Sequence, residues 1–289
     1  MSSPHTPEQL LQHVIDAAES GDLAALKTAL AEWDQVDDFE WFSRTFAELF
    51  IEQRHSIPER MFPLQRAFNK AAKHGHADVS AHLLEKGCVV TAPAVRYTFV
   101  RQHWDVAQLY LDSGWDINTP LEGGNTCPIL QEVISSPERV RWCLEHGADP
   151  MFVSSGRNMS ILGNAGNMAH VETFRILKEY GVDVRKSNVL HRAAGSTRKG
   201  RIEVMAFLLD EAGVNINQLE YEHDPDHFEG EHRIGEGTAL HSAVRVKSAE
   251  NIKFLLERGI DKDLVDWKGL KAVDKAREKD YAEGLALLE

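Results

Sequence analysis

The residues best suited to metal chemistry lie in the stretch 219–234, LEYEHDPDHFEGEHRI. It places three histidines, His223, His227 and His232, among six acidic residues. Imidazole and carboxylate groups are both good ligands of divalent metal ions. The intervals between these side chains match no established metal motif, so a solvated acidic loop is the favoured interpretation. We predict no cofactor, and we keep a metal-responsive loop as an alternative.

A second group, Arg96, Tyr97 and His103, has side chains that are common in catalysis. The sequence contains no G-x-S-x-G, H-E-x-x-H, P-loop or G-x-G-x-x-G signature. These three residues would act together only if irregular spacing around them created a deep pocket instead of an open groove. A small-molecule biosynthetic enzyme is therefore an alternative, and a protein without catalysis is the main expectation.

Short helices that end at regularly spaced glycines must position these side chains. Eleven positions separate His76 from Gly87, and the same interval separates His103 from Gly114, His170 from Gly181, and Ser248 from Gly259. Glycine takes the left-handed backbone that ends a helix more easily than other residues do. Each interval therefore predicts a helix that is closed by a glycine.

The clearest copy of the pattern is GTALHSAV at residues 237–244, which resembles the T-P-L-H-x-A-A motif of the ankyrin repeat. Residues 251–259 match the end of the family's second helix, and DWKG at 266–269 matches its D-x-x-G finger turn. The resemblance implies an all-α solenoid of stacked helix–turn–helix units with short β-turn fingers, in which no unit buries its apolar face alone. It also implies that His191 and His241 bond backbone groups between fingers.

This register divides the chain into a capping repeat at 1–36, an irregular helical segment at 37–60, and ankyrin repeats at 61–289 with an acidic finger insertion at 219–234. Aromatic residues in segment 37–60 recur at three- and four-residue steps, which predicts an amphipathic helix. We expect all of these parts to form one continuous solenoid domain.

Composition and charge exclude some classes of binding partner and indicate where the protein is located. The net charge of −13 argues against a non-specific nucleic-acid binder, which needs a basic surface. No apolar run approaches the roughly 20 residues of a membrane helix, and the N-terminus lacks the pattern of a signal peptide. Cys88, Cys127 and Cys143 lack a C-x-x-C pair and are expected to be buried. We therefore expect a cytoplasmic protein, with the nucleus as the alternative, that binds neither nucleic acid nor membrane.

The resemblance implies that partners are bound by side chains just after the A-A pair of each first helix and by side chains at the finger tips. Although the protein is acidic, most of these positions are basic or apolar. They are Lys73, His74, Arg101, Asn167, Met168 and Arg245 after the pair, and Glu122, Arg157, Arg185, Trp267 and Lys268 at the tips. We predict a non-catalytic scaffold whose concave groove binds an acidic or phosphorylated peptide, with Trp267 as an anchor, because Arg and Trp dominate binding at interfaces.

Overall fold

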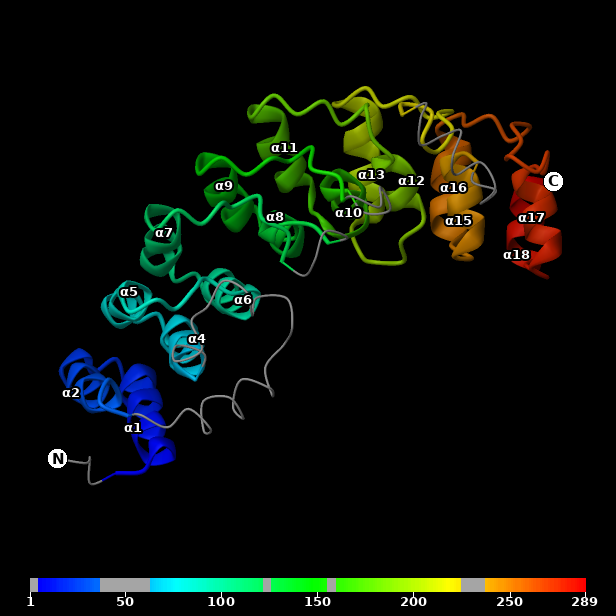
Figure 1. Cartoon of the computed structure of the whole chain (residues 1–289). Helices are drawn as coiled ribbons and strands as arrows, with labels where there is room; N and C mark the ends of the chain where they lie inside the picture. The colour runs from blue at the N-terminus through cyan, green and yellow to red at the C-terminus, as the bar shows by residue number, and fades with distance from the viewer. Residues whose placement is uncertain (1–4, 37–62, 122–125, 155–159, 225–236) are drawn as a thin grey trace. The chain divides into compact units, whose positions relative to one another are not determined.

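The computed structural model describes residues 5–36, 63–121, 126–154, 160–224 and 237–289 (Figure 1). They belong to two compact units, Met1–Gly123 and Gly124–Glu289. In the part of the chain that is described, helices follow one another in pairs, and strand pairing is limited to the isolated bridges Val153–Ser160 and Val265–Lys271. The predicted all-α class of stacked helix pairs is confirmed.

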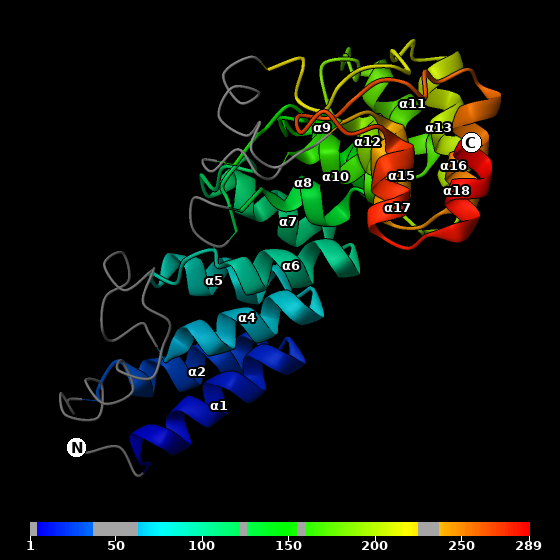
Figure 2. The same cartoon turned by 90° about the vertical axis from the view of Figure 1, so that its right-hand side faces the viewer.

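The N-terminal unit is built from two layers of helices. The first helices of its pairs, α1, α4 and α6, lie side by side, and the second helices, α2, α5 and α7, form the other layer (Figure 1); α1 and α4 are seen side by side again in Figure 2. The bounds are α1 Pro7–Ser20, α2 Leu23–Trp33, α4 Leu64–His74, α5 Ala77–Glu85, α6 Ala92–Arg101 and α7 Trp104–Asp112.

Local sequence explains these helices. Thr6 and Gln9 form a capping box before α1, and Asp22 accepts a hydrogen bond from the Ala25 N–H at the start of α2. Ala18 of α1 and Ala72 of α4 are fully buried, so the two helices approach closely. Each first helix therefore packs on the next one along the chain.

The C-terminal unit repeats this arrangement. Its first helices stack in the order α8, α10, α12, α15 and α17, and its second helices stack in the order α9, α11, α13, α16 and α18. The bounds are α8 Ile129–Val133, α9 Pro137–Glu145, α10 Ile161–Met168, α11 Val171–Glu179, α12 Val189–Ala194, α13 Arg201–Asp210, α15 Ala239–Arg245, α16 Ala249–Glu257, α17 Ala272–Glu278 and α18 Ala282–Leu288.

Glycine ends the second helices as the spacing predicts. Gly87, Gly114, Gly181 and Gly259 have φ angles of 105°, 90°, 77° and 80°. These values lie in the left-handed region, where a side chain would be strained. The register read from these glycines is therefore confirmed.

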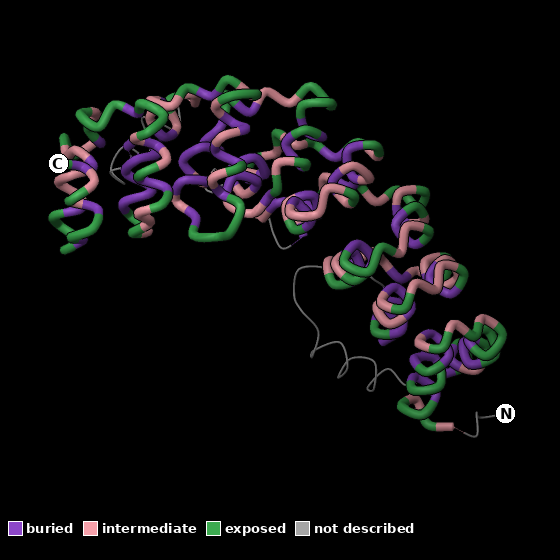
Figure 3. Tube along the Cα trace, turned by 180° about the vertical axis from the view of Figure 1, so that it is seen from behind, coloured by how far each residue is buried: buried purple, intermediate pink, exposed green. Residues whose placement is uncertain are grey.

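The cores lie between the two helix layers of each unit, where buried segments concentrate (Figure 3). Cys88, Cys127 and Cys143 are free and buried, as predicted. Burial raises the pKa of Cys88 and Cys143 to about 12 and that of Cys127 to about 11. All three thiols therefore stay protonated near neutral pH and are poor nucleophiles.

Two predicted features fall largely outside the described residues. The amphipathic helix expected in segment 37–60 is one of them, and the acidic insertion is described only as far as Asp224. Among the described residues, none of the helices combines the length and the apolar character needed to span a membrane.

Candidate functional site

The finger side of the C-terminal unit is held by histidines. His241 Nε2 lies 3.0 Å from the carbonyl oxygen of Leu270, while Nδ1 accepts a hydrogen bond from the Thr238 N–H at 3.1 Å. His191 Nε2 lies 2.9 Å from the carbonyl oxygen of Gln218 in the same way. The predicted bonds between fingers are confirmed.

Asp266 shapes the finger that follows α16. Its Oδ1 accepts the N–H groups of Lys268 at 2.8 Å and Leu270 at 3.0 Å, and Oδ2 pairs with Lys275 Nζ at 2.8 Å. Burial alone would raise the pKa of Asp266, but Lys275 and the two N–H donors together hold it below its ordinary value. This carboxylate therefore fixes the turn that presents Trp267 and Lys268.

The opposite side of each pair is the turn edge, by which we mean the segment that joins the first helix to the second. In the N-terminal unit the turn edge is held by histidines. His76 Nε2 lies 3.1 Å from the Glu19 carbonyl oxygen, and His103 Nε2 lies 3.2 Å from that of Lys73. A Cβ atom at Gly21 would lie 2.6 Å from His76 Nδ1, so glycine makes room for the ring.

In the C-terminal unit other donors reach the equivalent carbonyl groups. Arg201, which is 3% exposed, donates Nη1–H to the Gly166 oxygen at 2.6 Å and Nη2–H to the Ala169 oxygen at 2.5 Å. Asn251 Nδ2 donates to the oxygens of Ala194 at 2.9 Å and Ser196 at 3.1 Å. In both units, each of these donors satisfies helix-end carbonyls of the preceding pair.

Comparison with known proteins agrees with this repeat geometry. The family model described as "Ankyrin repeat" matches residues 237–267, the segment that contains His241 and Asp266. Stacked helix pairs recur along both units, and in each unit a side chain of one pair bonds a carbonyl at the turn edge of the preceding pair. The chain contains an ankyrin repeat at residues 237–267.

Among solved structures, the ankyrin repeat domain of human ASB11 is similar over 96% of this chain and 97% of that chain, at 21% identity and a TM-score of 0.45. Comparison with curated protein sequences gave no match. Ankyrin repeats in general are protein-interaction modules, and this ankyrin-repeat protein is a scaffold of that broad class.

The structure places three of the predicted binding residues at the turn edge of the N-terminal unit. Lys73 is half-buried, with Nζ 5.8 Å from the centroid of the Tyr97 ring. His74 is exposed, and its Nε2 lies 3.3 Å from Glu19 Oε1. Arg101 is exposed at the end of α6, and among the described residues it forms no ion pair.

Three more lie at the turn edge of the C-terminal unit. Asn167 and Met168 are half-buried at the end of α10. Arg245 is exposed at the end of α15, and its guanidinium lies against the preceding turn, where a Cβ atom at Gly195 would be 2.9 Å from Nη2. Gly195 therefore permits Arg245 to cross onto the neighbouring pair.

The predicted finger-tip residues differ in exposure and in whether they already form an ion pair. Arg185 is exposed, but it donates to both carboxylate oxygens of Asp183, at 2.7 and 3.0 Å. This pair lowers the pKa of Asp183 and raises that of Arg185. Trp267 is half-buried and Lys268 is exposed. Glu122 and Arg157 lie outside the described residues.

The residues of the two alternative functions, an enzyme pocket and a metal site, are described only in part. Tyr97 is 41% exposed and Arg96 is half-buried, while the His103 ring takes part in the turn-edge bond to Lys73. His223 Nδ1 lies 3.5 Å from Gln218 Nε2, and His227 and His232 lie outside the described residues. Within the described ranges, no group of three or more His, Cys, Asp or Glu side chains has metal-binding geometry.

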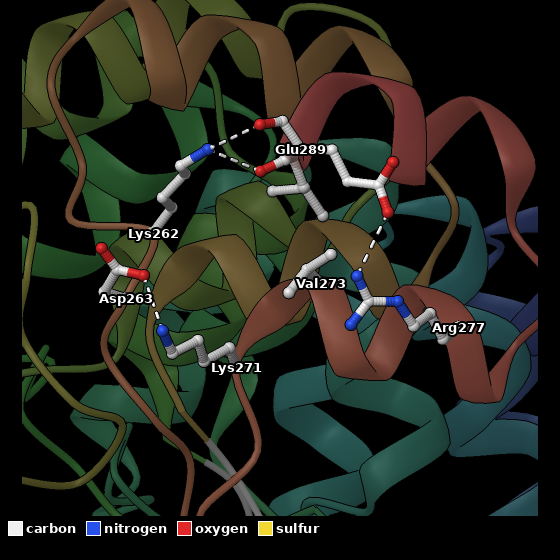
Figure 4. Close-up of a pocket in the computed structure, with 7 residues that line it drawn as sticks. Lys262, Asp263, Lys271, Val273, Arg277 and Glu289 are labelled. Atoms are coloured by element: carbon white, nitrogen blue, oxygen red, sulfur yellow. Dashed lines mark hydrogen bonds and ion pairs between the residues drawn. The ribbon is translucent and has the colours of Figure 1, made fainter.

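A hollow of about 160 Å³ lies beside α17 and α18 (Figure 4). Its cations are already engaged. Lys262 Nζ donates to the Leu288 carbonyl at 2.7 Å, Lys271 pairs with Asp263 at 2.8 Å, and Arg277 pairs with Glu289 at 3.1 Å. Two ion pairs and a hydrogen bond to the backbone therefore already engage these three cations, which disfavours binding of a charged ligand in the hollow.

Sequence reasoning missed the roles of Arg201 and Asn251. A signal for Arg201 was present, because the turn GSTRKGR has more residues than the other turns and a third basic residue follows its second glycine. Asn251 carries no comparable signal, since a polar residue near a helix start is ordinarily solvated. The side chains that hold the turn edge therefore had to be located from the structure.

Proposed function

We propose that this ankyrin-repeat protein is a non-catalytic scaffold that binds an acidic or phosphorylated peptide segment of a partner protein. The observation that carries the proposal is that Arg101 and Arg245, at equivalent ends of first helices, are exposed cations without a carboxylate partner among the described residues. The chain has a net charge of −13, so its acidic side chains outnumber its basic ones. Exposed arginines that nevertheless have no carboxylate beside them can bind the acidic groups of a partner protein.

Apolar side chains beside Arg101 favour a peptide over a free anion. Val100, next to Arg101, is 57% exposed, and Tyr97, one helical turn earlier, is 41% exposed. An acidic segment would place carboxylate or phosphate oxygens on the arginine and pack an apolar side chain on Tyr97 or Val100. The half-buried Trp267 would supply a further contact at the finger side.

The location follows from the same reasoning. The three cysteines are free, which is compatible with a reducing compartment. We propose the cytoplasm as the location, with the nucleus as the alternative.

The test compares affinity capture by the intact chain with capture by the Arg101→Glu/Arg245→Glu variant. Partners that bind through these arginines should be lost, with Kd raised about tenfold or more, and residual binding should depend less on salt. Arg66→Glu/Lys253→Glu is the control, because both side chains are exposed and neither lies at the turn edge. Equal capture by all three proteins would refute the proposal.

A further inference from the structure

Two neighbouring turns of the C-terminal unit carry a group of exposed cations. Arg198 and Lys199 lie in the turn between α12 and α13, and Arg245 and Lys247 lie at the turn between α15 and α16. We refer to these four residues as the turn-edge cluster. Within the described part of the chain, none of the four forms an ion pair with a carboxylate.

Several arginines elsewhere in the same unit form ion pairs. On the second-helix side, Arg141 pairs with Glu179 at 2.9 Å, and Arg258 donates to both carboxylate oxygens of Asp210. On the finger side, Arg192 lies 3.2 Å from the buried carboxylate of Glu220. Local carboxylates thus neutralise these cations, whereas the turn-edge cluster keeps its charge.

The turn between α12 and α13 is anchored on both sides. Ser196 Oγ donates to the Asn167 carbonyl at 3.2 Å on one neighbour, and Asn251 Nδ2 donates to the Ser196 carbonyl at 3.1 Å from the other. The Arg245 guanidinium also lies against Gly195. Because the backbone is held, a ligand would pay little entropy to order it.

Positive charge is concentrated at this edge. Burial, together with the nearby Arg198, lowers the pKa of Arg201, and Glu203 offsets this only in part. Glu203 and Glu250 are the acidic residues in the first turns of α13 and α16, which directly follow the cluster, and both are exposed. Four exposed cations therefore outnumber two carboxylates.

We infer that the turn-edge cluster binds a phosphorylated serine or threonine in an acidic segment of the partner. This rests on the proposed function and specifies the partner's chemistry at one place. A single arginine can satisfy a carboxylate, whereas a phosphate group carries a charge of about −1.5 to −2 and three acceptor oxygens. Arg198 and Arg245 would supply planar donors, and Lys199 and Lys247 would supply point charges.

The test uses the full chain and three immobilised pools of degenerate peptides. The pools differ only at the central position, which is phosphoserine or phosphothreonine, the unmodified residue, or glutamate. The wild-type chain should bind the phosphorylated pool at least about tenfold more tightly than either other pool. Arg198→Glu/Lys199→Glu should abolish this preference, and Arg175→Glu/Lys253→Glu, which reverses two exposed cations on second helices, should keep it.

The outcomes separate the inference from the proposed function. If Arg101→Glu/Arg245→Glu loses its partners while Arg198→Glu/Lys199→Glu still prefers the phosphorylated pool, the function stands and the cluster is excluded as the site. Equal binding of the glutamate and phosphorylated pools would overturn recognition of phosphate. Competition by a single-stranded oligonucleotide at equal charge would show a general polyanion surface and would also overturn the inference. Far-ultraviolet circular dichroism and a thermal melt confirm that each variant is folded.

Discussion

The turn edges of the two units use different side chains to bond the carbonyl groups at the ends of the first helices. Each first helix ends in carbonyl groups that lack a partner within the helix. In the N-terminal unit the imidazoles of His76 and His103 bond these groups. In the C-terminal unit the buried guanidinium of Arg201 and the amide of Asn251 do so, each reaching two carbonyls.

The difference teaches that the repeat requires a donor at this place but not a particular residue. A histidine bonds one carbonyl and needs a glycine beside its ring, as at Gly21. Arg201 bonds two carbonyls but places a charge in the interior, and its Nε is buried without a hydrogen-bond partner among the described residues. The C-terminal unit therefore gains bonds and positive charge at the same edge.

The largest effect is expected for Arg201→Ala. Two buried carbonyls would lose their donors, which should lower the stability of α10 and α13 by about 3 kcal/mol. Native-state hydrogen exchange of these helices measures it locally, because repeat arrays need not unfold in two states. Arg175→Ala, an exposed paired arginine, should change exchange little. A neutral or stabilising Arg201→Met would show that charge burial outweighs the two bonds.

Asn251→Ala is expected to cost about 2 kcal/mol, since it removes two hydrogen bonds without relieving a buried charge. Faster exchange should appear in α12 and α16, which the amide connects. Asn251→Asp, with similar shape and no Nδ2 donor, should behave no better than alanine. The neighbouring exposed Glu250 provides the matched control Glu250→Ala. Equal effects of Asn251→Ala and Glu250→Ala would contradict the assigned role.

His76→Ala is expected to cost about 1 kcal/mol, because it removes a single bond to the Glu19 carbonyl. Exchange in α1 and α4 reports the change. The exposed His74, two residues earlier, is the control, and His74→Ala should have little effect. A loss for His76 as large as that for Arg201 would erase the difference between the two turn edges.

The smallest effect concerns charge at the N-terminal turn edge. The hydrogen bond from Lys70, with help from His74, lowers the pKa of Glu19. A lowered folded-state pKa adds stability above the ordinary glutamate pKa, and that stability is lost as pH falls through the lowered value. Lys70→Met should therefore move the Glu19 pKa back toward its ordinary value in a carboxyl NMR titration. An unchanged titration would mean that Lys70 does not neutralise this turn.

The fold could be predicted from the sequence because the backbone conformations at helix ends require particular residues, and these residues recur along the chain. Gly87 and Gly259 mark left-handed helix ends, and Pro137 stands at the first position of α9, where proline is favoured. His191 and His241 make the bonds between fingers that the family resemblance implies. Such positions recur at fixed intervals, so each copy supports the reading of the others.

The candidate site was less readable because the availability of a charge depends on its neighbours in space. Arg185 and Arg245 look alike in sequence, yet Asp183 holds the first and the second lies over Gly195. The D-x-R spacing before Arg185 was a usable signal for its pairing. The burial of Arg201 depends on the packing of α13 against the end of α10, which no local pattern records.

The turn-edge bonds all point one way along the chain. His76, His103, Arg201 and Asn251 each reach back to carbonyls of an earlier pair. During translation, the helix-end carbonyl groups of a newly made helix pair would therefore lack these hydrogen-bond donors until the next helix pair leaves the ribosome. A pause in translation between two helix pairs would expose the last completed pair to chaperones. Each helix pair of the growing chain would become resistant to proteolysis only after the following pair has been synthesised.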